Sequence, residues 1–336
     1  MRYDKPPLST QDQAQQLQDR GLVCADVDKV QHYLTHIGYY RLSAYWLPFE
    51  QPAAADGTSR NHQFQPGTTF EQVLSLYVFD RKLRLLVMEA IERIETAVRS
   101  HWANALALRH GAHAHMQASL FKSPWQHAQD LARIASELHE SNETFVAHYR
   151  QRYDEPFLPP IWAVVETLSL GALSRWFKAT KDTDAKREVA KSLGMPTIEI
   201  LERVLHVLTP VRNVCAHHAR LWNRRFTLQL PHIRRFNGHD GRMAIEEIIG
   251  SRQAKVDCGQ CGKAINQEQP DMQRQPSRLL FNYLLVMAHL MRRINPNSSW
   301  QARLRQHIQS ANQEQQQAMG FPDGWEQWAI WQEIAV

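Results

Sequence analysis

The chain has 336 residues, of which 43% are hydrophobic and 22% charged, so it can bury a sizeable core and wholesale disorder is excluded. Its 14 glycines and 16 prolines are too few for a turn-rich β-sandwich or barrel, which favours a helical protein. Lys and Arg exceed Asp and Glu by 39 to 34. This modest positive balance fits either ordinary solubility or an anionic partner, nucleic acid first.

The first seven residues contain no apolar run of the kind that a signal peptide needs. The longest apolar stretch, 281–291, is too short to span a bilayer and contains Asn282 and His289. A chain of this length with 4 cysteines does not have a disulfide scaffold. Together these features predict a soluble cytoplasmic protein.

Short helices are expected over residues 9–47. Asp26 can cap a helix whose apolar positions recur every three or four residues, and Gly38 can end it. The next stretch is dense in aromatic residues, which suit either a core or a platform for stacking bases: Tyr39, Tyr40, Tyr45 and Trp46. Residues 51–67, rich in turn formers, predict a loop.

The longest periodic stretch predicts a helix from Phe70 to about His110, and Thr69 with Gln72 has the pattern of a capping box at its start. A polar stripe runs through the middle of this helix: Asp80, Arg84, Glu92, Glu95 and Arg99. The stripe is either a solvated face with i,i+4 ion pairs or a surface that holds the side chains of a functional helix.

Further helices are expected at 123–152, 161–177 and 196–208, with Gly171 either tolerated or marking close packing. Over 237–276 the apolar periodicity fades, which predicts a partly ordered insertion with at most a short helix near 243–249. Residues 277–293 are again helical in pattern, and the tail is rich in tryptophan. Strands are expected to be minor.

The segment 209–224 carries the clearest chemical pattern. Thr209 and Pro210 are the residue types preferred at the N-cap and first position of a helix, so a helix is expected to start there. Arg212 would then be the third helical residue, where free N–H groups and the helix dipole favour an anion. His217 would lie about 7.5 Å along the axis and about 140° around it, so the two side chains would flank a groove.

Arginine and histidine at this spacing suit chemistry on a phosphate. A guanidinium can clamp the phosphate and stabilise the charge of a pentacovalent intermediate, and a neutral imidazole can take or return a proton. RNA carries its own nucleophile, the 2′-OH, so no metal is strictly needed. From the spacing alone, a capped helix with a packed histidine and a solvated arginine is the simpler interpretation.

Several motifs occur in an order that covers most of residues 3–225 and continues in the tail. They are Lys5-Pro6-Pro7-Leu8-Ser9, Arg20-Gly21-Leu22, Ile37-Gly38-Tyr39-Tyr40-Arg41-Leu42-Ser43-Ala44-Tyr45, Leu76-Tyr77-Val78-Phe79-Asp80-Arg81-Lys82-Leu83-Arg84, Glu92-Arg93-Ile94-Glu95 with Arg99, Leu158-Pro159-Pro160-Ile161-Trp162 with Glu166, Leu168-Ser169-Leu170-Gly171-Ala172-Leu173-Ser174, Arg212-Asn213-Val214-Cys215-Ala216-His217-His218-Ala219-Arg220-Leu221-Trp222-Asn223, and Gly320-Phe321-Pro322 with Trp325. Each motif is weak alone. The ordered set resembles the Abi family of bacterial abortive-infection proteins (the AbiD/AbiF-like group), which belongs to the HEPN superfamily.

The resemblance implies an all-α fold, a HEPN-like helical bundle with additional N- and C-terminal helices. It also implies that Arg212, Asn213 and His217 act as metal-independent ribonuclease groups, without a cofactor, usually in a site shared across a homodimer or higher homo-oligomer. We therefore expect a phage-defence endoribonuclease of the toxin–antitoxin kind that cleaves RNA. The alternative is a non-cleaving scaffold that holds a structured small RNA or a partner protein.

Four regions are expected: an N-terminal helical region at 1–69, the HEPN-like core with the motif at 70–230, the insertion at 231–276, and a C-terminal helical region at 277–336. Cys258 and Cys261 form half of a zinc knuckle, but no second pair of ligands follows, so two reduced thiols are favoured over a metal site.

Two further sets of residues are assigned around the motif. A basic cluster suits an RNA backbone: Arg220, Arg224, Arg225, Arg234 and Arg235. Trp222, Phe226 and Phe236 lie between these arginines and either stack on bases or belong to the core. A supporting role beside the motif is expected for Asp80, Arg84, Glu95, Arg99 and His218.

Overall fold

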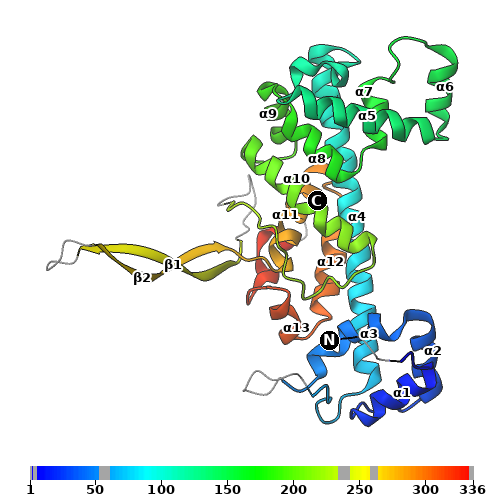
Figure 1. The fold of residues 1–336 in the computed structure, drawn as a ribbon, viewed down its shortest axis with the longest axis vertical. Helices are drawn as coiled ribbons and strands as arrows, with labels where there is room; N and C mark the ends of the chain where they lie inside the picture. Colours follow the sequence, from blue (N-terminus) through cyan, green and yellow to red (C-terminus); the bar gives the residue numbers. More distant parts are fainter. Residues whose placement is uncertain (1, 3–5, 53–60, 234–242, 258–263, 333–336) are drawn as a thin grey trace. The chain divides into compact units, whose positions relative to one another are not determined.

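The computed structural model describes residues 2, 6–52, 61–233, 243–257 and 264–332 (Figure 1). The fold is all-α, as the sequence predicts, and the only strands among the described residues form one two-stranded hairpin. The chain folds into two compact units. The first is formed by Met1–Leu85 with His218–Leu221, and the second by Leu86–His217 with Trp222–Val336.

The first unit contains α1 (Thr10–Asp19), α2 (Val27–Ile37), α3 (Tyr39–Trp46), the 3-10 helix η1 (Leu47–Phe49) and the beginning of α4 (Phe70–His110). The predicted cap of α2 is confirmed, because Asp26 accepts a hydrogen bond from the Lys29 backbone N–H at 2.9 Å. The capping box of α4 is confirmed too: Thr69 N donates to Gln72 Oε1 at 2.8 Å, and Gln72 N donates to Thr69 Oγ1 at 3.3 Å. Local side-chain chemistry therefore sets where these helices begin.

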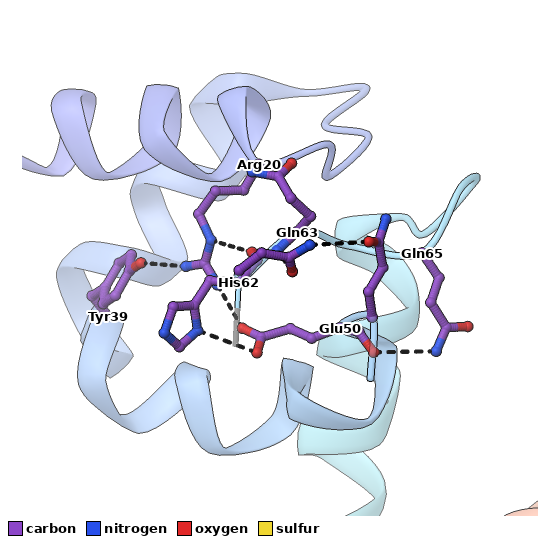
Figure 2. A network of polar contacts seen from close by, with 8 residues as sticks. Arg20, Tyr39, Glu50, His62, Gln63 and Gln65 are labelled. Atoms are coloured by element: carbon purple, nitrogen blue, oxygen red, sulfur yellow. Dashed lines mark hydrogen bonds and ion pairs between the residues drawn. The ribbon is translucent and has the colours of Figure 1, made fainter. Parts of the chain in front are cut away.

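A buried carboxylate, Glu50, ties the end of α1 to α3 and to the segment after η1 (Figure 2). The Arg20 guanidinium donates to Glu50 Oε1 at 2.5 Å, to the Tyr39 hydroxyl at 2.9 Å and to the His62 carbonyl at 2.6 Å. The same guanidinium lies 5.3 Å from the centroid of the Phe64 ring. Arg20 thus supplies the charge partner that a buried carboxylate requires, and it fixes the first residue of α3.

The second unit contains the rest of α4 and the following elements: η2 (Ala114–Met116), η3 (Ala118–Leu120), α5 (Pro124–Glu140), α6 (Thr144–Arg152), α7 (Ile161–Val164), η4 (Val165–Thr167), α8 (Leu170–Ala179), α9 (Thr183–Ser192), α10 (Ile198–Ala216), β1 (Ile245–Asp257), β2 (Ala264–Pro276), α11 (Leu280–Ile294), α12 (Trp300–Gln309), α13 (Gln313–Ala318), η5 (Trp325–Gln327) and η6 (Ala329–Trp331).

Two of the predicted helical stretches are interrupted by serines. The stretch 123–152 breaks at Ser141, the C-cap of α5, before α6 begins. The stretch 161–177 breaks before Ser169, whose hydroxyl accepts the Ala172 N–H at 3.3 Å and caps α8. Serine competes for backbone hydrogen bonds, which explains why apolar periodicity alone overestimated both lengths.

Gly171 marks close packing of α8 against α10. A Cβ atom at this position would lie 3.1 Å from Thr209 Cγ2, which is tighter than an ordinary van der Waals contact. The glycine therefore lets the two helices approach, as one of the two readings of the sequence predicted.

The core of the second unit is built around α11, in which Leu280 to Arg292 are all buried. The Phe281 ring packs on Phe321, with centroids 5.0 Å apart, and Trp300 and Trp331 of the tryptophan-rich tail are also buried. The apolar stretch 281–291 thus serves as the centre of a core. In the part of the chain that the structure describes, no helix combines the length and the apolarity that a bilayer crossing needs.

The short helix predicted near 243–249 is wrong, because Ile245 begins a strand instead. β1 and β2 pair antiparallel from Ile245 opposite Pro276 to Asp257 opposite Ala264. Strand formation here depends on hydrogen bonds to a partner strand, and a local sequence window does not contain that partner. Cys258 and Cys261, the half zinc knuckle, lie outside the described residues.

Candidate functional site

The helix that carries the Arg212–His217 motif does not start at Thr209. It begins at Ile198, where the Thr197 hydroxyl accepts the Ile200 N–H at 3.3 Å, and continues to Ala216 with Pro210 inside it. Thr209 donates its hydroxyl to the Leu205 carbonyl at 3.1 Å, so it does not act as an N-cap. The predicted helix start is wrong because packing of a long apolar face outweighs the hydrogen bond that Pro210 cannot donate.

This course places the motif at the carboxyl end of α10. Arg212 and Asn213 lie in the last turns, and His217 is the C-cap residue, with its backbone N–H donating to the Asn213 carbonyl at 2.9 Å. The anion site expected from a helix N-terminus is therefore wrong. The dipole at this end favours a cation, so any phosphate here must be attracted by side-chain charge, chiefly that of Arg212.

The three motif side chains are available to a ligand. Asn213 and His217 are exposed, and Arg212 is half-buried. Across the described ranges of the chain, none of these three side chains takes part in a hydrogen bond or an ion pair. A guanidinium, an amide and an imidazole thus lie at one helix end without a structural task within the chain.

The chain leaves the motif through a strained turn. His218, the residue after the C-cap, has φ +56°, in the left-handed region that costs a residue with a Cβ roughly 1–2 kcal/mol. The turn leads into His218–Leu221, which belongs to the first unit. Such a conformation persists when the surrounding structure holds it in place.

Within the first unit, a buried carboxylate receives this segment. Both oxygens of Asp80, which is 0% exposed, accept the Leu221 N–H, at 3.1 and 3.2 Å. Arg84 forms an ion pair with Asp80 and donates to the Ala219 carbonyl at 3.5 Å. The Tyr45 hydroxyl donates to Asp80 at 2.7 Å. Backbone and side chains together therefore satisfy the Asp80 charge.

The Tyr45 hydroxyl stays protonated in this network. Burial, and secondarily the negative charge of Asp80, raise the pKa of Tyr45 above its ordinary value. A protonated phenol can donate to the carboxylate, and it also accepts from Arg84 at 3.0 Å. The sequence predicted Asp80 and Arg84 as supporting residues but did not identify the Tyr45 hydroxyl as their partner.

Two more arginines hold the segment after the motif, again within the first unit. Arg41 of α3 donates to the His218 carbonyl at 2.6 Å, and Arg220 donates to the Ala44 carbonyl at 2.7 Å. Arg220, predicted as an RNA contact, therefore has a structural bond within the chain. Arg41 was not singled out from the sequence, although it lies in one of the quoted motifs.

Two further members of the polar stripe, Glu95 and Arg99, pair with each other in the second unit. Arg99 donates to Glu95 Oε1 at 2.6 Å and to the Leu168 carbonyl at 2.5 Å, and it lies 3.5 Å from Glu166 Oε2. The partner of Glu95 is thus Arg99 rather than Arg212 or His217. Since Asp80, Arg84 and Glu95 are all buried, the solvated-face interpretation of the stripe is wrong for them, whereas Glu92 is exposed.

The basic cluster is divided by the structure. Arg225 is exposed and Arg224 is half-buried, while Arg234, Arg235 and Phe236 lie outside the described residues. Trp222 and Phe226 are 3% and 4% exposed, so of the two alternatives left open by the sequence, base stacking and the core, the structure supports the core. The Phe226 ring packs 4.4 Å from that of Tyr283, which explains its burial.

Comparison with known proteins adds one finding. A family model described as Abi-like protein matches residues 32–223, which is more than half of the chain and includes the second part of α2, all of α3 to α10 and the motif. No curated protein and no solved structure matches the chain.

Proposed function

The chain belongs to the Abi-like protein family, and from that premise we propose that it is an abortive-infection protein of the AbiD/AbiF-like group and the HEPN superfamily, acting in phage defence as a metal-independent endoribonuclease. The observation that carries the proposal is that the Arg212, Asn213 and His217 side chains form no hydrogen bond or ion pair among the described residues. Side chains without a structural role in that part of the chain are free to act on a substrate.

The reaction follows from these residue types. The 2′-OH attacks the adjacent phosphorus, so an O2′–P bond forms and the P–O5′ bond breaks. The products are a 2′,3′-cyclic phosphate and a 5′-hydroxyl end. One imidazole takes the 2′-OH proton and another gives a proton to the leaving 5′-oxygen. Arg212 stabilises the charge of the pentacovalent phosphate, and Asn213 orients the substrate.

Each chain supplies a single motif histidine, so two proton transfers favour a site that two copies share. The mixing of variants tests this. An excess of His217→Ala protein should lower the activity of the natural sequence when the two are mixed, because a mixed dimer lacks one of the two imidazoles. A protein that sediments as a monomer at full activity would rule out the shared site.

The central experiment is incubation of RNA with the protein in EDTA, followed by analysis of the new ends. We expect cyclic phosphate and 5′-hydroxyl ends from the natural sequence and none from His217→Ala. RNA that is bound but uncut would instead favour the alternative, a scaffold that holds a structured small RNA. Cleavage that EDTA abolishes would contradict the metal-independent mechanism.

A further inference from the structure

The exposed positions of α10 (Ile198–Ala216) lie along one side of the helix. They are Glu199, Arg203, His206 and Asn213, followed by the C-cap residue His217. Successive members are three, four or seven residues apart, which keeps all of them within about 80° around the helix axis. The motif residues Asn213 and His217 are therefore the carboxyl end of a longer exposed face of α10.

The neighbouring helix α8 (Leu170–Ala179) adds positive charge beside this face. Gly171 lets α8 pack closely on Thr209 of α10, and the exposed positions of α8 are Arg175 and Lys178. Arg175 Nη1 lies 4.0 Å from the place that a Cβ atom on Gly171 would occupy. The Arg175 charge is thus held where the two helices meet.

The Lys178 charge lies close to α10 as well. Partial burial, and then the positive charges of Arg203 and Lys178, lower the pKa of His206 below its ordinary value. An effect of this kind requires both charges to lie near the imidazole. At neutral pH the uncharged His206 ring can still donate a hydrogen bond to a phosphate oxygen, while the neighbouring cations supply the charge.

The cations of the two helices are not neutralised in the part of the chain that the structure describes. Arg175, Lys178 and Arg203 form no ion pair there. Arg203 donates through Nε to the Gln229 carbonyl at 3.0 Å, which leaves its two Nη groups for a ligand. Three cations gathered on one surface without counter-charges attract an anion.

Acidic residues mark the amino end of this positive surface. Glu202 is already paired with the buried Lys186, and the exposed Glu199 lies about one turn before Arg203. From Arg203 to His217 the exposed face runs for about 21 Å along the helix axis. That is the length of about six stacked nucleotides, each with a rise of about 3.4 Å.

We infer that α10 and α8 form a phosphate track, in which Arg203, Arg175 and Lys178 bind the backbone of the nucleotides that neighbour the one cut at His217. The inference rests on the proposed function and adds substrate-binding residues to the same site. Arginine binds phosphate oxygens with its planar fork of N–H groups, and lysine acts as a point charge. Because such contacts carry no sequence information, the track predicts an affinity with little sequence preference.

The test measures RNA binding apart from cleavage, in full-length protein that carries His217→Ala. The probe is a fluorescent single-stranded RNA of about 12 nucleotides, which exceeds the length of the track. The triple change Arg175→Ala, Lys178→Ala and Arg203→Ala should lower the slope of log affinity against log salt by about 2, at about 0.7 per phosphate. Fluorescence anisotropy at several salt concentrations measures the slope.

Two controls separate the track from net charge and from folding. The triple change Arg133→Ala, Arg152→Ala and Arg187→Ala removes the same charge at exposed positions of α5, α6 and α9, and it should leave the slope unchanged. The double change Arg175→Lys and Arg203→Lys keeps both charges and should retain the slope. The melting temperature of each protein shows whether it is folded.

A slope that the track variant leaves unchanged would overturn the inference, and so would an equal fall in the charge-matched control. Cleavage is measured separately in proteins that keep His217. There the track variant should raise KM for the long RNA and leave kcat unchanged, and it should cut a dinucleotide, which is too short to reach Arg203, as the natural sequence does. Track-dependent binding without any cleavage would remove the nuclease and keep the track. Cleavage of the long RNA with an unaltered kcat/KM would keep the nuclease and remove the track.

Discussion

Within the segment 212–221, the motif residues 212–217 and the following residues 218–221 differ in whether the rest of the fold contacts their backbone. The side chains of Arg212, Asn213 and His217 make no hydrogen bond or ion pair among the described residues, although the backbone is an ordinary helix end. From His218 to Leu221 the backbone itself is bound, by Arg41, Arg84 and Asp80. The motif side chains are thus unengaged among the described residues, whereas the residues that follow them are held by their backbone.

The largest expected effect follows from removing a free side chain. His217→Ala and Arg212→Ala should each lower RNA cleavage about 10²- to 10⁴-fold, the range for a proton-transfer or charge-stabilising group. Because both side chains lack partners within the described chain, helical content by circular dichroism and the melting temperature should stay unchanged. His218→Ala is the control and should matter less to the cleavage step. Near-normal cleavage by His217→Ala would show that this histidine is no proton-transfer group.

In the second part of the segment, residues 218–221, we expect a substitution at the supporting carboxylate to lower the stability of the fold. Asp80→Asn keeps the shape of the side chain but leaves Arg84, which is 5% exposed, without its charge partner. Breaking a buried ion pair costs about 3–5 kcal/mol of the free energy of unfolding. Denaturant unfolding measures the loss, with Asp184→Asn as control, since that exposed carboxylate pairs with the exposed Arg187. If both variants unfold like the natural sequence, Asp80 does not hold the turn.

A buried histidine sets the pH range in which these comparisons can be made. Burial, with smaller effects of His113 and His127, lowers the pKa of His115 to about 4. Both ring nitrogens of His115 lack a partner among the described residues. Between pH 4 and 6.5 the unfolded chain binds a proton that the folded chain does not, so stability falls as pH drops through this window.

The loss should approach about 3 kcal/mol at pH 4 and be absent above pH 6.5. Thermal unfolding from pH 4 to 8 measures it. His115→Leu should flatten the profile, whereas His139→Leu, at an exposed position, should not. A pH profile that is the same in all three proteins would mean that another group carries the dependence. Cleavage should accordingly be compared above pH 6.5.

Removing one partner of the Glu95–Arg99 pair should lower the free energy of unfolding by less than the Asp80→Asn change does. Glu95→Ala removes a charged hydrogen bond at a buried position, but Glu166 remains 3.5 Å from Arg99. We expect a loss of about 2 kcal/mol in stability, against less than about 0.5 for Glu137→Ala on the exposed face of α5. If Glu95→Ala and Glu137→Ala lower the free energy of unfolding equally in denaturant titrations, the Glu95–Arg99 pair does not stabilise the fold.

The success of sequence reasoning depended on how local the deciding interaction was. Asp26 and the Thr69–Gln72 box were found because a cap and its partner lie three residues apart. Thr209 and Pro210 form an equally good local signal for a helix start. The helix nevertheless runs through them, because α10 buries apolar residues both before and after Pro210. The strand at Ile245 depends on Pro276, far along the chain, and no local window contains it.

The same distinction applies to the site. Asp80 and Arg84 could be singled out because two charges in the middle of an apolar helix require partners. The partners themselves, the Tyr45 hydroxyl and the Leu221 N–H, lie 35 and 141 residues away from Asp80. Burial of Trp222 and Phe226 likewise depends on packing that the spacing of arginines and aromatics does not encode.

The smallest effect is expected from Arg224 and Arg225, two basic residues that lie outside the segment 212–221. If Arg224 and Arg225 contact the RNA backbone, replacing both by Ala releases two phosphates from neutralisation. The slope of log affinity against log salt should then fall by about 1.4 for a single strand, at about 0.7 per phosphate, with only a few-fold loss of affinity at low salt. The double change Arg133→Ala and Arg187→Ala removes the same charge at exposed positions that carry ion pairs of their own, and it should leave the slope unchanged. Fluorescence anisotropy at several salt concentrations distinguishes the two pairs. An equal change in the salt slope for both double variants would mean that net charge alone attracts the RNA. A salt slope that the Arg224 and Arg225 changes leave unaffected would place the contacts with the RNA backbone elsewhere. Arg212 would then remain as the phosphate-binding arginine that the site requires.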